Sequence, residues 1–402
     1  MYDKIVKFEE QYRPETIKNY KHLHMHPEIS YEERETAAFV AERLNKLPLD
    51  EIKTGVGGCG VSALLRGGRP GPVVALRADM DALSITEKTG VDYASRSPGV
   101  MHGCGHDGHT AMLLTAAAVL CEMKEELPGS VRFIFQPAEE KTPRGGAQGM
   151  IEEGVLDSPR VDAVLGMHLW PALPTGEIAI QPGAVSAASD HLTIKVSGKA
   201  SHGAIPDEGI DANLAAAAVL VALQGIVSRR VPPRESAVIS IGTMNGGTKY
   251  NIIAEEAILD GTVRTFNPSI REMMPKWIEQ AAKGAAEAYG AAAAIDYAKG
   301  YPSVINAPEI AETAREAAAA VFGEEGLAPK IPIPPIGEDF SFYAQKRPAL
   351  FAMLGCRPQG VLPEDMPALH NDRFLPDLKA LSYGVRYICA AAVTTLKRLG
   401  EK

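Results

Sequence analysis

The chain has 402 residues, of which 46% are apolar and 23% are charged, and its formal net charge at pH 7 is −9. This composition excludes a disordered chain, and the acidic balance gives no basis for a nucleic acid or an anionic membrane as partner. Because single hydrophobic cores stop growing at about 300 residues, we expect two domains.

The first 20 residues predict an amphipathic helix. They mix acidic and basic side chains without an apolar core run, which differs from a secretory signal. We also expect no apolar stretch long enough to span a membrane. The five cysteines are odd in number and scattered, which argues against a disulfide framework. These features favour a cytoplasmic protein with reduced thiols and a small-molecule ligand.

Three apolar segments predict buried strands, and each ends in polar side chains. They are residues 71–83 with Asp79 and Asp81, residues 130–140 with Glu139 and Glu140, and residues 161–170 with His168. In open α/β sheets, ligands bind at the carboxyl ends of the strands, so we expect a site there. A helix is predicted over residues 109–127, with Asp107 or Thr110 as its N-cap.

Residues 188–302 predict a second unit inserted into the first. The expected strand, helix, strand, strand, helix and strand cover residues 191–196, 211–228, 237–244, 257–266, 269–289 and 291–297. This βαββαβ order is the split βαβ plan of ferredoxin-like domains. Because helices and strands resume afterwards, we expect residues 1–187 and 303–402 to form one α/β domain, with a mixed sheet and helices on both faces.

The segment VMHGCGHDGHT, residues 100–110, gathers three histidines and a cysteine among three glycines. Glycines permit a tight, irregular backbone that can aim several donor atoms at one point. A lone histidine is more often structural than a ligand. Cys104 and His106, combined with the carboxylates and His168 at the strand ends, offer sulfur, nitrogen and oxygen donors. That mixture suits zinc and similar transition metals.

The sequence resembles the M20 metallopeptidases, and within them the aminoacylase-like amidohydrolases that include hippurate hydrolases and auxin-conjugate hydrolases. The resemblance runs almost end to end. Its markers are HLHMHPEISYEE (22–33), LRADMDAL (76–83), MHGCGHDGHTAMLL (101–114), FQPAEE (135–140), GMH (166–168), SGKASHGAIPDEGIDA (197–212), DGTVRTF (260–266), GEDFSFY (337–343) and LHNDRF (369–374). It implies a zinc-aminopeptidase-like catalytic domain and an inserted lid domain that serves dimerisation.

The resemblance also implies a site with two divalent ions per subunit. Its ligands map onto Cys104, His106, Glu140, His168 and His370, with the Cys104 thiolate near both ions. Zinc or manganese is expected, and cobalt or nickel is compatible with the same donors.

Other histidines near these motifs are expected to have structural roles. His102, Asp107 and His109 are expected to shape the loop or support the ligands. The spacing of His22, His24 and His26 resembles a metal cluster, but they lie outside the implied ligand set.

The two adjacent glutamates are expected to differ in role. Glu139 matches the general base, which takes a proton from water and passes it to the leaving amine. Asp81 is expected to orient a ligand or to tune Glu139, although Asp79 and Asp81 could also be a capping pair or salt-bridge partners.

Three residues of the inserted unit match positions that contact the substrate. His202 matches a residue that reaches across a dimer to the tetrahedral oxyanion. Asn251 and Arg264 match substrate-binding positions, where the guanidinium would hold the free carboxylate of the amino acid.

The resemblance implies hydrolysis of N-acyl or N-aroyl amino acids to a carboxylic acid and a free amino acid. A dipeptidase or carboxypeptidase of the same family is the main alternative, because its substrates also place an amide beside a free carboxylate. A catalytically silent protein that binds acylated amino acids is a third hypothesis. We expect a homodimer or homotetramer formed through the inserted unit.

Overall fold

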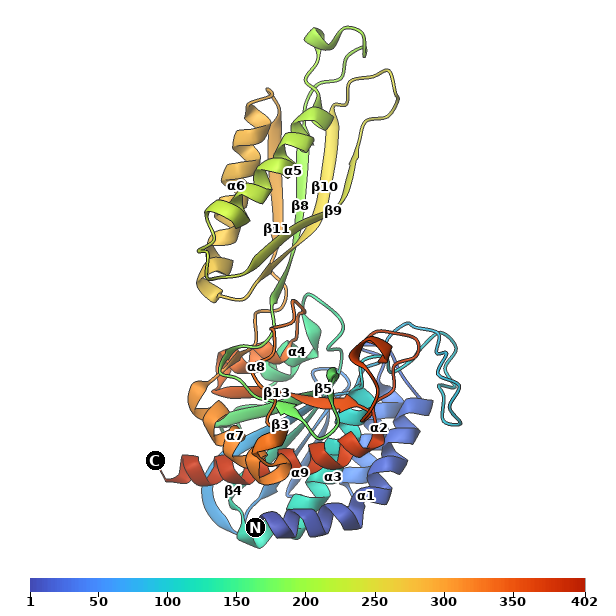
Figure 1. The fold of residues 1–402 in the computed structure, drawn as a ribbon, viewed down its shortest axis with the longest axis vertical. Coiled ribbons are helices and arrows are strands. Elements are labelled where there is room, and N and C mark those ends of the chain that lie inside the picture. Colours follow the sequence, from blue (N-terminus) through green and yellow to red (C-terminus); the bar gives the residue numbers. More distant parts are fainter. Residues whose placement is uncertain (402) are drawn as a thin grey trace. The chain divides into compact units, whose positions relative to one another are not determined.

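The computed structural model describes residues 1–401, and the chain divides into two compact units, each drawn in Figure 1. The first comprises residues 1–185, 304–332 and the chain from Asp339 onward. The second comprises residues 186–303 and residues 333–338. The sequence placed the inserted unit at residues 188–302, without the short segment that returns to it.

The first unit is built on a seven-stranded sheet with the order β1-β2-β4-β3-β5-β13-β6. The strands are β1 (Glu51–Val56), β2 (Gly60–Arg66), β3 (Arg69–Asp79), β4 (Pro128–Gln136), β5 (Ala163–Pro174), β6 (Ile178–Ala179) and β13 (Ala349–Arg357). β3 runs parallel to β4 and β5, and β13 runs parallel to β5. β1, β2 and β6 add antiparallel edges. The predicted mixed sheet is therefore confirmed.

Helices cover both faces of this sheet (Figure 1). They are α1 (Tyr2–Met25), α2 (Arg34–Leu44), α3 (His106–Glu122), α4 (Gly145–Glu152), α7 (Pro308–Phe322), α8 (Phe340–Lys346) and α9 (Leu378–Gly400). Side chains alternate across a strand, so Val74 and Leu76 of β3 join the core beneath α1, α3 and α9. Val73 and Ala75 point to the opposite core, which α4 and α8 cover. A short two-stranded sheet pairs β7 (Gly183–Ala184) with β12 (Ile305–Asn306).

The second unit is an antiparallel sheet with the order β11-β8-β10-β9, covered by two helices. Its elements are β8 (Ala188–Ser197), α5 (Ala212–Arg229), β9 (Ala237–Gly246), β10 (Glu256–Thr265), α6 (Pro268–Glu287) and β11 (Ala292–Ala298). Leu192, Ile194 and Val196 of β8 are buried against α5 and α6, while the residues between them are exposed or half-buried. The predicted βαββαβ order is confirmed.

The expectation that no stretch could span a membrane does not hold for α5. Ala212–Arg229 is long and apolar enough by length and composition, and it is the one such helix among the described residues. In the structure α5 packs against the four-stranded sheet, where Ala215, Val219, Leu223 and Ile226 are buried. Only 33% of this helix is buried, and a single helix of this kind is weak evidence for a membrane.

Candidate metal centre

The glycine-rich segment of residues 100–105 leads directly into α3, which begins at His106. The predicted N-caps, Asp107 and Thr110, are wrong because both lie inside the helix. Gly105 precedes the helix with a φ of +90°, a conformation that favours glycine. The Asp107 carboxylate is already engaged, because it contacts His24 Nδ1 at 2.6 Å and accepts from Gly108 N at 2.8 Å.

The structure brings the five predicted ligands together in two groups of three. Cys104, His106 and His168 form one group, and Cys104, Glu140 and His370 form the other. Within each group, one donor atom per residue lies within 4.8 Å of the others. Cys104 belongs to both groups, which is the arrangement expected for a thiolate shared by two ions.

The predicted ligands come from several elements and loops of the first unit. Cys104 lies in the loop before α3, His168 lies on β5, and Glu140 follows β4. His370 lies before α9 with a φ of +63°, and its Nε2 is 3.0 Å from Glu140 Oε1. The carboxyl ends of the parallel strands therefore meet the loops at one place, as the sequence predicted.

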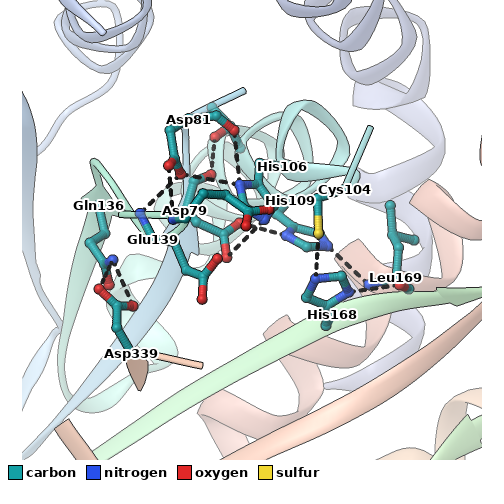
Figure 2. Close-up of polar contacts among 12 residues, drawn as sticks. Asp79, Asp81, Cys104, His106, His109, Gln136, Glu139, His168, Leu169 and Asp339 are labelled. Carbon is teal, nitrogen blue, oxygen red and sulfur yellow. Dashed lines mark hydrogen bonds and ion pairs between the residues drawn. The ribbon is translucent and has the colours of Figure 1, made fainter. Parts of the chain in front are cut away.

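The imidazoles of His106 and His168 are held through Nδ1, which leaves the Nε2 atom of each for a cation. His106 Nδ1 contacts the Asp81 carbonyl oxygen at 2.9 Å, while its Nε2 is buried without a hydrogen-bond partner in the part of the chain that the structure describes. His168 Nδ1 bonds to the Leu169 carbonyl oxygen at 2.7 Å, and its Nε2 lies 3.4 Å from Cys104 Sγ (Figure 2). Metal-bound histidines are typically held in this way through their other nitrogen. The donor set therefore fits transition-metal ions.

The electrostatics of the site also favour cations. Burial lowers the pKa of His106, but Asp79 and Asp81 outweigh burial and raise that pKa to about 10. Burial, with the charges of Glu140 and Glu139, raises the pKa of the Cys104 thiol well above its usual value. Burial lowers the pKa of His168, which keeps its imidazole neutral. A bound cation reverses the effect at Cys104, because coordination deprotonates a thiol.

Asp81 connects the ligands to the predicted base. Its carboxylate accepts from Ser30 Oγ at 2.6 Å and from the backbone N–H groups of Glu139 and Glu140 at 3.1 and 3.0 Å. Its Oδ1 also lies 3.2 Å from His106 Nδ1 (Figure 2). Burial raises the pKa of Asp81. The hydrogen bond with His106 and its other partners lower this pKa by more than burial raises it, so the net shift is downward. The Asp81 carboxylate therefore joins the His106 ring to the backbone of Glu139 and Glu140.

Glu139 lies at the edge of the donor groups. Its side chain is 6% exposed, and a carboxylate oxygen lies within 4.8 Å of donor atoms of His106 and Glu140. A carboxylate so close to the ligands can exchange a proton with a molecule held there.

A buried network behind the ligands was not predicted as a unit. Arg77 donates to Asp79 Oδ2 at 2.6 Å and to Asp339 Oδ1 at 2.8 Å. Asp79 Oδ1 contacts His109 Nδ1 at 2.6 Å, and His109 Nε2 accepts from the backbone N–H of Leu169 at 2.9 Å (Figure 2). His109 therefore holds the backbone beside His168. Arg77 and Asp79 are two residues apart on β3, so their side chains lie on the same face of the strand. This spacing is the one sequence signal for their contact.

His22 and His24 of α1, and His102 before α3, lie outside the two donor groups. His24 is buried and contacts Asp107 Oδ2 at 2.6 Å and Glu87 Oε1 at 3.2 Å. Burial lowers the pKa of His24, but its acidic partners outweigh burial and raise it. His22 stacks on Phe39 with ring centroids 4.2 Å apart. His102 is buried, and its two ring nitrogens have no hydrogen-bond partner among the described residues.

The three predicted substrate residues of the second unit are more exposed. His202 is exposed, and its Nδ1 accepts from Ala204 N at 3.1 Å. The adjacent Gly203 N donates to the Asn251 carbonyl oxygen at 2.8 Å, so the loops of His202 and Asn251 lie side by side. Arg264 is half-buried on β10, where it donates to Thr262 Oγ1 and to the Val263 carbonyl oxygen. Burial lowers the pKa of Arg264.

Together, the sheet and the shared-thiolate donor groups define a dinuclear metal-dependent hydrolase that acts on amide bonds. The model of the peptidase family M20/M25/M40 matches residues 75–394, and the chain belongs to that family.

Its similarity to individual proteins extends over most of the chain. It is 44% identical to the N-acyl-L-amino acid amidohydrolase of Geobacillus stearothermophilus, over 76% of this chain and 82% of that protein. It is 37% identical to thermostable carboxypeptidase 2 of Saccharolobus solfataricus, over 90% of each chain. The crystal structure of Bacillus subtilis YXEP protein, described as a dinuclear metal binding peptidase from the M20 family, superposes with a TM-score of 0.85. That match has 35% identity and covers 96% of this chain and 99% of that chain.

Proposed function

We propose that this amidohydrolase cleaves N-acyl amino acids, including N-acetyl and N-aroyl forms, to a carboxylic acid and a free amino acid. The observation that carries the proposal is the pairing of Glu139 with two donor groups that share Cys104. The 44% identity to an N-acyl-L-amino acid amidohydrolase supports this substrate class.

The residues of the first unit would perform the proton transfers. Cys104, His106, Glu140, His168 and His370 would hold the ions. When bound, two divalent ions would supply Lewis acidity toward the amide carbonyl and would lower the pKa of water. Glu139 would accept the proton of the attacking water and return it to the leaving nitrogen, so that the amine departs neutral. Asp81 would keep His106 and Glu139 in place through the bonds described above.

The residues of the second unit would recognise the substrate. Arg264 would pair with the free carboxylate of the amino acid, and Asn251 would hydrogen-bond to the same half. His202 would donate a hydrogen bond to the tetrahedral oxyanion from the partner subunit. This role requires a homodimer or homotetramer assembled through the second unit, which would also act as a lid. We further propose zinc or manganese as the ions and the cytoplasm as the location, where a thiol ligand stays reduced.

A carboxypeptidase or dipeptidase is the second candidate function. The 37% identity to a thermostable carboxypeptidase favours it, and its substrates also present an amide beside a free carboxylate. Arg264 would serve either activity. The presence of Glu139 beside the donor groups argues against a silent binding protein.

A substrate panel separates these candidates. The protein is stripped of metal, reloaded with zinc or manganese, and assayed on N-acetyl and N-benzoyl amino acids, dipeptides and longer peptides. We expect kcat/KM to be highest for the acylated amino acids and to fall for their methyl esters, which lack the free carboxylate. Higher kcat/KM values for peptides would favour the second candidate, and binding without turnover would favour the silent protein.

A further inference from the structure

The backbone of residues 138–140 donates all of its N–H groups to buried carboxylates. Ala138 N donates to Glu33 Oε1 at 2.7 Å. Glu139 N and Glu140 N donate to the two oxygens of Asp81 at 3.1 and 3.0 Å. Successive N–H groups arranged in this way form a concave site for anions. Here the anions are two carboxylates of the chain itself.

The conformation of Ala138 depends on these contacts. Its φ is +53°, which is uncommon for a residue with a Cβ atom. A residue keeps such a conformation only where contacts with the surrounding structure hold it there. The Ala138 carbonyl oxygen accepts from Gly146 N at 3.1 Å, so Glu33 and Gly146 hold the two sides of this residue. Because Ala138 precedes Glu139, its dihedral angles set the direction in which the Glu139 side chain leaves the backbone.

Glu33 is an unusual residue to place at this position. It is fully buried, and its second oxygen, Oε2, has no hydrogen-bond partner within residues 1–401. It forms no ion pair among the described residues. Burial and the nearby charge of Asp81 raise the pKa of Glu33 to about 7. Burying a carboxyl group without an ion-pair partner is unfavourable, and backbone hydrogen bonds such as that from Ala138 N offset part of this cost.

Glu33 and Asp81 belong to one connected assembly. Ser30, three residues before Glu33, donates through Oγ to Asp81 Oδ2 at 2.6 Å. Ala82 N donates to the Glu28 carbonyl oxygen at 2.8 Å, which joins the segment before α2 to the end of β3. The two carboxylates are therefore positioned by segments that are bonded to each other.

We propose that Glu33 is a positioning residue for Glu139. By accepting the Ala138 N–H group, Glu33 fixes the left-handed turn that directs Glu139 toward the donor groups. Of the backbone N–H groups of residues 138–140, Asp81 accepts only from those of Glu139 and Glu140, so the Ala138 N–H group depends on Glu33 for its hydrogen bond. The inference rests on the proposed function, in which Glu139 is the general base.

Substitutions at Glu33 test the role by separating turnover from binding. Glu33→Met keeps the length of the side chain but removes the acceptor, and we expect kcat to fall about 100-fold, the loss typical of a misplaced catalytic group. KM and the two ions per subunit should stay unchanged. Glu33→Gln retains an acceptor oxygen and should restore most of the turnover. Glu32→Gln, at the exposed neighbouring position, is the matched control.

A second measurement needs neither substrate nor turnover. Amide hydrogen exchange of the peptide covering residues 137–141 should accelerate in Glu33→Met and remain slow in Glu33→Gln. Glu33→Ala is measured alongside, so that poor folding of one variant does not decide the result. Unchanged exchange and unchanged kcat in a folded variant that lacks the acceptor would overturn the inference. If the wild-type protein lacks turnover on the panel but Glu33→Met accelerates exchange, the proposed function fails while the structural role of Glu33 stands.

Discussion

The polar residues of the metal centre and those of the second unit are held in different ways. Asp79, Asp81 and His106 are almost completely buried, and each has several hydrogen bonds or ion pairs with fixed neighbours. His202 and Asn251 are exposed on neighbouring loops. The first set is positioned by its own unit, whereas the second is left available for contacts from outside it.

This contrast shows where each part of the proposed reaction acquires its geometry. Metal ligands and a proton carrier need fixed distances before the substrate arrives, and buried networks provide them. Substrate contacts can form on binding, so their residues need not be fixed in advance. We therefore expect changes in the first unit to affect metal and turnover, and changes in the second unit to affect substrate and subunit contacts.

Metal removal should have the largest effect. Exhaustive chelation is expected to abolish activity while the circular dichroism spectrum is retained, because two large clusters of buried apolar side chains pack on the seven-stranded sheet. Restoring zinc or manganese should restore turnover. Activity in protein shown by metal analysis to be empty would contradict the two-ion mechanism.

Substitution of the paired glutamates should distinguish their roles within the first unit. Glu139→Gln is expected to retain both ions and to lose about 10³–10⁴-fold in turnover, because the proton carrier is removed. Glu140→Gln should lose metal as well as activity, since Glu140 belongs to a donor group. Metal content is measured beside kcat. Equal metal loss in both variants would show that the assigned roles are wrong.

Substitution of His202 should have the next largest effect on turnover. A partner subunit with an intact His202 should restore the lost activity. His202→Ala is expected to lower turnover about 10²–10³-fold, as for loss of one oxyanion donor. Mixing this protein with Glu139→Gln under conditions of subunit exchange should restore activity, because one site of each heterodimer is then complete. No recovery after demonstrated exchange, or an active monomer, would rule out a shared site.

The smallest effect should be a loss of stability confined to the second unit. The Asp211 side chain caps α5 by accepting from Asn213 N and Leu214 N at 2.9 and 3.2 Å. Asp211→Ala is expected to lower the free energy of unfolding by about 1 kcal/mol. Calorimetry of the metal-loaded protein would measure the shift, with the exposed Asp207→Ala as control. A change in metal content would contradict the independence of the two units.

The sequence predicted the helices, the strands and the polar side chains that follow the strands. It did not predict the hydrogen bonds that hold those side chains in place. Apolar runs and their polar ends located β3, β4 and β5, because these signals are local. The bond from Ala138 to Glu33 joins residues 105 positions apart, and no local pattern encodes it. The same holds for the contact between His24 and Asp107, which spans 83 positions.

The predicted start of α3 failed for a related reason. Asp107 is a good N-cap residue by type, but its carboxylate is bound by His24 from α1. Gly105 instead starts the helix from a left-handed conformation. The short return of residues 333–338 to the second unit also had no sequence signal, since it contains no helix or strand.

The discontinuous first unit has a consequence for synthesis on the ribosome. Residues emerge in order, so the four strands of the second unit are all present once Ala298 has left the exit tunnel. The first unit still lacks β13, which lies between β5 and β6 in its sheet, and α9, which packs in its main core. Domains generally fold as units during translation. The sheet of the second unit can therefore form before residues 333–338 join it, while β5 in the first unit still lacks its neighbour β13.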